Sequence, residues 1–150
     1  MADVQLVIFN LGNEEYAVNI MQVKEIVNYL EPVKVPNTPE FIEGIINLRG
    51  EIIPIINLKK RFNIADNDLR EQTRIMVMSI DSKKIGFIVD DASEVISISE
   101  ESIEPAPDIV AGIDRKYITG IGKAQDRILI ILELDKLFSE NEYEALETIE

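Results

Sequence analysis

The chain has 150 residues, enough for one domain or two very small ones, and its 46% hydrophobic and 29% charged residues are ordinary for a soluble globular protein. It carries 28 acidic and 15 basic residues and a net charge of −13, so phosphate backbones and anionic membranes repel it. We therefore expect no nucleic-acid partner and no direct insertion into a membrane.

The residue types that are missing exclude several kinds of chemistry. The sequence has no histidine and no cysteine, which removes histidine-dependent triads, thiol chemistry, disulfides and zinc sites built on these ligands. Residues 119–123 have a glycine pattern but lack the first glycine and the final hydroxyl of a phosphate-binding loop. We predict a turn or strand start there, no enzyme, no catalytic residue, no metal ligand and no cofactor.

The N-terminal region predicts a cytoplasmic protein. No positively charged residue precedes Lys24, so the first residues do not resemble a signal peptide. The longest uninterrupted apolar runs have about five residues, whereas a membrane span needs about 20.

Short runs rich in isoleucine and valine predict a mostly β fold, because side chains branched at Cβ suit a pleated sheet. Turn residues such as Gly12, Gly50 and Ser82 separate these runs. In chain order, the strands are expected near residues 4–11, 15–19, 24–30, 42–48, 51–57, 73–80, 84–90, 93–98, 117–123 and 127–133.

A short α-helix is expected at the C-terminal end. Ser139 can cap it, and Glu142 completes a capping box three residues later. Tyr143, Leu146 and Ile149 then form one apolar stripe. Docking of this stripe on the rest of the chain is the simpler prediction, and docking on a partner is the alternative.

The sequence also repeats itself at constant offsets. Residues 52–62 resemble residues 128–138 at an offset of 76, and residues 16–18 resemble residues 85–87 at an offset of 69. The first offset also pairs Gly44 with Gly120. Each half then contains a hairpin, a third strand, a loop, a second hairpin and a short helix. Chance similarity between apolar strands is the alternative, but the constant offset favours a duplication and predicts two small closed barrels without exposed edges.

The middle of the chain carries the most specific motif. Residues 35–58 read VPNTPEFIEGIINLRGEIIPIINL. This segment closely resembles the CheW family, the coupling proteins of bacterial chemotaxis. Other stretches resemble the same family in the same order, so that the resemblance covers nearly the whole chain: residues 10–16, 20–26, 87–90, 103–107 and 117–120.

The resemblance implies both a fold and a function. It implies one CheW-like domain, residues 1–150, made of two five-stranded SH3-like barrels. The barrels of this family are interleaved, so one sequence repeat need not be one barrel. It also implies a non-catalytic adaptor that couples the cytoplasmic tips of methyl-accepting chemoreceptors to the regulatory domain of the histidine kinase CheA, at membrane-associated arrays.

Four positions match those that the family uses for receptor coupling: Val23, Glu25, Gly44 and Arg49. Arg49 is expected at a hairpin tip beside Gly50, where its guanidinium can pair with a carboxylate of a partner or with Glu25. The alternatives are an exposed turn arginine of little consequence and a Gly44 needed only for close strand packing.

The kinase-facing surface is expected near the strand at residues 73–77. Ile75 and Met76 either anchor that interface or belong to the core, and the sequence leaves both roles open. Arg74 stands where the family pattern is apolar. Two other functions stay open: the adaptor module of a phosphorylatable coupling protein, and a barrel that binds a small ligand or an oligonucleotide. The acidic charge and the 6% aromatic content argue against base stacking.

Overall fold

The computed structural model describes residues 3–12, 14–62, 64, 69, 71–80, 82–106, 109–110, 113–114, 117–124 and 126–136. Ten of its strands agree with the expected ones to within a few residues, and the C-terminal helix expected from Ser139 lies outside the described residues. The strands are β1 (Asp3–Leu11), β2 (Glu14–Asn19), β3 (Val23–Asn28), β4 (Ile42–Leu48), β5 (Glu51–Asn57), β6 (Arg74–Ile80), β7 (Lys83–Val89), β8 (Asp91–Ser99), β9 (Ile103–Glu104), β10 (Ile109–Val110), β11 (Ile113–Asp114), β12 (Ile118–Ala124) and β13 (Arg127–Leu132). The helices are α1 (Leu58–Arg61) and the 3-10 turns η1 (Ile20–Gln22), η2 (Glu100–Ser102) and η4 (Leu134–Lys136).

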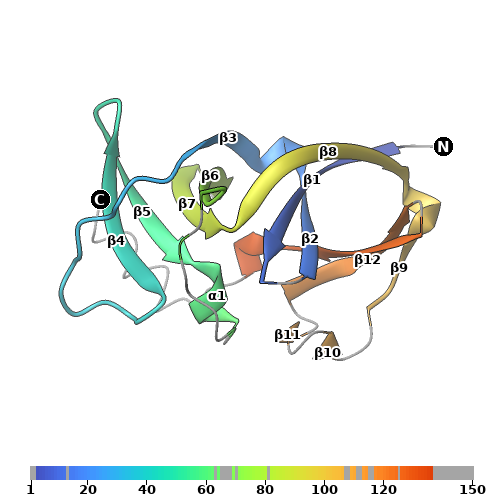
Figure 1. Cartoon of the computed structure of the whole chain (residues 1–150). Coiled ribbons are helices and arrows are strands. Elements are labelled where there is room, and N and C mark those ends of the chain that lie inside the picture. The colour runs from blue at the N-terminus through green and yellow to red at the C-terminus, as the bar shows by residue number, and fades with distance from the viewer. Residues whose placement is uncertain are drawn as a thin grey trace.

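The first barrel, which we call the central barrel, is built from the middle of the chain. Its strand order is β3-β6-β7-β5-β4. Val33, a few residues after β3, pairs with Ile45 of β4. One chain run therefore borders both edges of the sheet and closes it, at the left of Figure 1.

The second barrel, the terminal barrel, combines strands from both ends of the described chain. Its order is β8-β1-β2-β13-β12-β9. Only η2 separates β8 from β9, so again a single chain run borders both edges. The curved strands of this barrel lie at the right of Figure 1. Closure removes the unpaired edges that invite aggregation.

The two barrels are interleaved, as the family resemblance predicts. The expected repeat is visible as β1 to β5 followed by α1, and β6, β7, β8, β12 and β13 followed by η4. However, β1 and β2 complete the barrel of the second repeat, and β6 and β7 complete the barrel of the first. Each exchanged hairpin joins its barrel through a parallel pair, β5 with β7 and β13 with β2. The chain consequently crosses between the barrels twice, at η1 and at Asp90.

Both barrels close over a glycine at a β-bulge. Gly44 follows a register shift in β4, and Gly120 follows the equivalent shift in β12. A Cβ on Gly44 would lie 2.1 Å from the Val33 carbonyl oxygen, and one on Gly120 would lie 2.8 Å from the Glu104 carbonyl oxygen. Because real Cβ atoms do not approach oxygen so closely, glycine is needed where the closing segment crosses the bulge.

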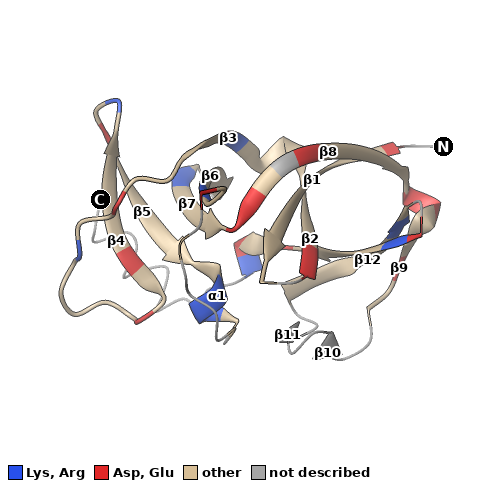
Figure 2. Cartoon of the chain, viewed as in Figure 1, with Lys and Arg blue, Asp and Glu red and all other residues tan. Residues whose placement is uncertain are grey.

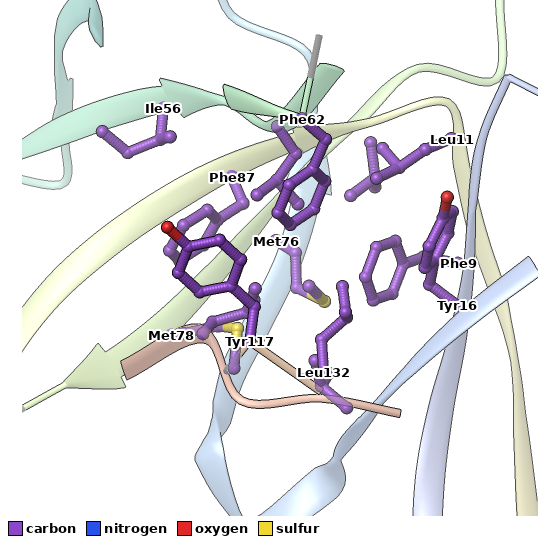
Figure 3. Packing of buried hydrophobic residues seen from close by; sticks show 14 of the residues in the cluster. Phe9, Leu11, Tyr16, Ile56, Phe62, Met76, Met78, Phe87, Tyr117 and Leu132 are labelled. Carbon is purple, nitrogen blue, oxygen red and sulfur yellow. The ribbon is translucent and has the colours of Figure 1, made fainter. Parts of the chain in front are cut away.

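Three apolar cores hold the molecule together. One fills each barrel, and a third lies between the barrels, where side chains of β1, β2 and β13 meet side chains of β5, β6 and β7. Figure 3 shows Phe9, Tyr16 and Leu132 facing Phe87 and Met76 in this inter-barrel core. These strands are covered on both faces, which explains why the sequence shows unbroken apolar runs there rather than alternation.

Burial decides the role of the two residues proposed for kinase contact. Ile75 points into the central barrel and Met76 into the inter-barrel core, and both are 0% exposed. The structure gives both residues the core role that the sequence left open beside the interface role, because neither side chain has accessible area. Arg74 begins the same strand and donates to the carbonyl oxygens of Glu71 and Thr73.

Candidate protein-interaction site

The tip of the β4–β5 hairpin presents an arginine in a strained backbone conformation. Arg49 and Gly50 have φ values of 51° and 88°, as a tight two-residue hairpin turn requires. The Asn47 Oδ1 atom accepts a hydrogen bond of 2.9 Å from the Gly50 N–H and fixes the turn. Asparagine and aspartate tolerate positive φ better than arginine does, so the residue type at this tip points to a function of the side chain.

The Arg49 guanidinium reaches back to β3 and pairs with the Glu25 carboxylate. The carboxylate partner expected from the sequence is therefore present within the chain. The Arg49 side chain stays two-thirds exposed, at 66%, so the pair remains open to a partner. A second pair, Lys84 with Glu51 at 2.9 Å, lies next to the same turn, because Glu51 is the first residue of β5. Figure 2 shows basic and acidic segments together at this tip.

The other two positions expected for receptor coupling, Val23 and Gly44, are partly and fully buried. Val23 is half-buried at the start of β3 and packs against the inter-barrel core. Gly44 is buried at the bulge that closes the central barrel. The structure thus brings Glu25 and Arg49 together, places Val23 two residues from Glu25, and gives Gly44 the packing role that the sequence left open.

Exposed apolar side chains on β3 and on the 3-10 turn before it were missed from the sequence. Met21 is 85% exposed on η1, and Ile26 is partly exposed on the outer face of β3. Burial alternates along β3, and Lys24, Ile26 and Asn28 point outward. The alternation can be seen in the sequence and could have identified Ile26 as an exposed residue.

The repeat preserves exposed apolar residues in the terminal barrel. Val95 on β8 is the equivalent of Ile26, at the offset of 69, and is 54% exposed. Ile128 on β13 is the equivalent of Ile52, at the offset of 76, and is 66% exposed. Both barrels therefore present apolar side chains to solvent at matching positions. Single exposed apolar residues are common on a monomer surface, but they need not recur at matching positions.

A charged network lies next to Val95 and Ile128. The Arg127 guanidinium donates two hydrogen bonds to Glu94, at 2.7 and 2.8 Å, and two to Glu15, at 2.5 and 3.2 Å. These hydrogen bonds from Arg127 lower the pKa of Glu94, and the two carboxylates raise the pKa of Arg127. The network ties β2, β8 and β13 of the terminal barrel together.

The densest basic run of the sequence is engaged in contacts within the chain. Lys59 pairs with Asp90 at 2.7 Å, and Lys60 pairs with Glu43 at 2.7 Å. The Arg61 guanidinium lies over the rings of Phe41 and Tyr117, 5.2 and 5.3 Å from their centroids. Lys59, Lys60 and Arg61 therefore make contacts that stabilise the fold.

Among the residues that the structure describes, no three histidine, cysteine, aspartate or glutamate side chains gather in a way that could hold a metal ion. In the same part of the chain, no helix is long and apolar enough to span a membrane.

Fold and site together define a class of protein: a mostly β scaffold of two interleaved barrels that presents a charged hairpin tip and exposed apolar residues for protein contact. Residues 5–142 match the model of the CheW-like domain. The chain is 40% identical over 146 residues to chemotaxis protein CheW of Treponema pallidum, covering 95% of this chain and 86% of the relative. It is 37% identical over 145 residues to CheW of Klebsiella aerogenes, covering 97% of this chain and 87% of the relative.

A solved structure agrees with this result. The scaffolding protein TtCheW of Thermoanaerobacter tengcongensis superimposes with a TM-score of 0.86 at 45% identity, covering 95% of this chain and 92% of that one. The chain belongs to the CheW family of chemotaxis proteins.

Proposed function

We propose that this chemotaxis adaptor couples the cytoplasmic tips of chemoreceptors to the regulatory domain of the histidine kinase CheA, without catalysis, in the cytoplasm at membrane-associated arrays. The observation that carries the proposal is the pair of exposed apolar surfaces at matching positions on two barrels that share one apolar core. An adaptor needs two separate surfaces, and one interaction surface on each barrel meets that need.

We assign the receptor to the central barrel. Met21 and Ile26 supply exposed apolar area, and the Arg49–Glu25 pair supplies a charged group at the adjoining hairpin tip. Apolar anchors give most of the energy of a protein interface, and a charged rim selects the partner and its orientation. Val23 supports this surface from below, and Gly44 shapes the strand that carries the tip.

We assign the kinase to the terminal barrel, in place of the buried Ile75 and Met76. Val95 and Ile128 are exposed there, beside the Arg127 network. The kinase and the receptor then bind to different barrels and can bind at the same time. The adaptor acts by position, since it raises the effective concentration of the kinase at the receptor.

Two matched variants test both assignments by calorimetry at moderate salt, with the CheA regulatory domain and a receptor-tip fragment as ligands. Ile26→Asp should weaken receptor binding at least about tenfold and leave kinase binding unchanged, because a carboxylate in an apolar contact loses hydration. Val95→Asp should do the reverse, so each variant is the control for the other. Folded wild-type protein that binds neither ligand would refute the function, and equal effects of both variants on both ligands would refute the assignment.

A further inference from the structure

Two charged side chains are buried where the chain passes from one barrel to the other. Among the described residues, Lys59 and Asp90 are the buried basic and acidic side chains, 4% and 6% exposed. Lys59 lies in α1, which follows the central barrel strand β5, and Asp90 lies between β7 of the central barrel and β8 of the terminal barrel. Their charged atoms are 2.7 Å apart.

Asp90 joins three parts of the molecule. Its Oδ1 atom faces the Lys59 ammonium, and its Oδ2 atom accepts a hydrogen bond of 2.7 Å from the N–H of Gly12, in the turn between β1 and β2. Its own N–H donates to the carbonyl oxygen of Asn10 at 2.9 Å. The crossing is thereby held to the central barrel by one contact and to the terminal barrel by two.

The Lys59 side of this junction depends on charge. The Lys59 ammonium lies 2.7 Å from the Asp90 carboxylate, the distance of a close, charge-assisted contact. Burying two charges removes their hydration, and this cost offsets most of their attraction, so such a pair adds little net stability. If either charge lost its partner the cost would rise steeply, so the pair is tolerated in one geometry only.

Most of the remaining inter-barrel contact has no such directionality. The core between the barrels is apolar, and Met76 and Met78 lie within it. Methionine adapts to several packings, and the hydrophobic effect is proportional to area rather than to orientation. At the other crossing, η1, the described residues include no buried residue, and Met21 points into solvent.

We propose that the Lys59–Asp90 pair sets the orientation of one barrel relative to the other, and so sets the spatial relation of the two interaction surfaces. A sliding or turning movement in the apolar core keeps its buried area but separates the two charges. α1 adds a second contact of the same kind through Arg61, which donates to the Tyr117 hydroxyl at 3.1 Å just before β12 of the terminal barrel. This short helix is therefore a positioning element.

Distance measurements between two spin labels test the proposal on the protein alone. The chain has no cysteine, so labels can be attached to Asn28→Cys on β3 and Ser97→Cys on β8, both exposed. The critical variant is Lys59→Met with Asp90→Asn, which leaves no unpaired buried charge and keeps an acceptor for Gly12. We expect the single narrow distance of the wild type to be lost. Lys59→Arg should retain it, and so should Lys60→Met, which removes a pair within the central barrel.

Each outcome of the distance measurement either supports or overturns the proposal. A folded double variant with the wild-type distance distribution overturns the proposal. Should the double variant not fold, Asp90→Glu serves instead, because it keeps both charges and lengthens the link by one methylene. Its distance should shift, and an unchanged distance would equally overturn the proposal.

A functional measurement rests on the proposed function above. The double variant should bind the receptor fragment and the kinase domain separately as the wild type does, yet lose their joint assembly. Wild-type joint assembly by this variant would count against the positioning role. Absence of any binding by the wild type would refute the proposed function instead, and the spin-label distances would still decide the orientation.

Discussion

At the scale of single residues, the tip of the β4–β5 hairpin is defined by the backbone conformation of Arg49 and by its ion pair with Glu25. The two-residue turn requires a positive φ at position 49, but it requires neither an arginine there nor the ion pair to Glu25. The pair is largely exposed, so it adds at most about 1 kcal/mol to stability. Under the proposed function, the pair contributes through what it presents to the receptor.

A charge swap separates recognition from structure at this tip. Arg49→Glu should weaken receptor-fragment binding by about 1–3 kcal/mol, because a hydrogen-bonded charge is lost at the interface. Glu25→Arg combined with Arg49→Glu restores the internal pair with reversed charges, and we expect binding to stay weak. Full recovery in the double variant, measured by calorimetry, would mean that the pair only stabilises the hairpin.

Gly44 should tolerate substitution much less than Gly50. Gly44→Ala combines a φ of 145° with a Cβ 2.1 Å from a carbonyl oxygen, whereas a Cβ on Gly50 would meet nothing within 4 Å. We expect a loss of about 2–4 kcal/mol in the free energy of unfolding for Gly44→Ala and about 1–2 for Gly50→Ala. Urea denaturation measures both, and equal losses would contradict the role of Gly44 in barrel closure.

Tyr16 predicts a loss of stability at alkaline pH. Burial, followed by the charge of Glu14, raises the pKa of Tyr16 from 10.0 to about 12. The unfolded chain therefore releases this proton first, and the folded state loses about 2–3 kcal/mol as the pH rises from 10 to 12. Tyr16→Phe should lose less stability over this range when urea denaturation is compared at both pH values. Parallel decreases in the two proteins would exclude Tyr16 as the cause.

At the scale of elements, ion pairs link strands that lie far apart in the sequence. Arg127 joins β13 to β2 and β8, and Lys59 joins α1 to the β7–β8 crossing. Neither link can be inferred from local sequence, since Arg127 and Glu15 are 112 residues apart.

Loss of the Arg127 network should reduce stability at neutral pH but not in acid. Hydrogen bonds from Arg127 lower the pKa of Glu94, so their contribution is present above the unfolded pKa of about 4.5 and disappears as the pH falls below it. Because these groups are partly exposed, Arg127→Gln should cost about 1 kcal/mol at pH 7. Lys123→Gln, which removes an exposed pair with Glu104, is the matched control. A cost that persists unchanged at pH 3 would contradict this assignment.

At the scale of the whole molecule, the exchange of hairpins makes the barrels depend on each other. The inter-barrel core contains buried side chains from both barrels, and each barrel needs strands from both repeats. Residues 1–150 should therefore behave as a single domain, although two barrels are visible.

Hydrogen exchange can measure this dependence. Amides in the middle of β1 and of β6 should exchange with the same free energy of opening, that of global unfolding, because neither barrel survives the loss of the shared core. The two strands lie in different barrels, so each is the reference for the other. A clearly lower value in either strand would show that its barrel opens independently.

Much of this protein was determined by its sequence alone. Runs of branched side chains and the turn residues between them located ten strands, and two offsets revealed the repeat, because these signals depend on neighbouring residues. Only the tertiary structure showed that Ile75 and Met76 are buried, since a strand covered on both faces has no polar side to reveal its surroundings. It also decided that the partner of Arg49 lies within the chain and that Lys59 meets Asp90 at the crossing. Contacts between distant segments depend on how the chain closes and crosses, which local composition does not encode.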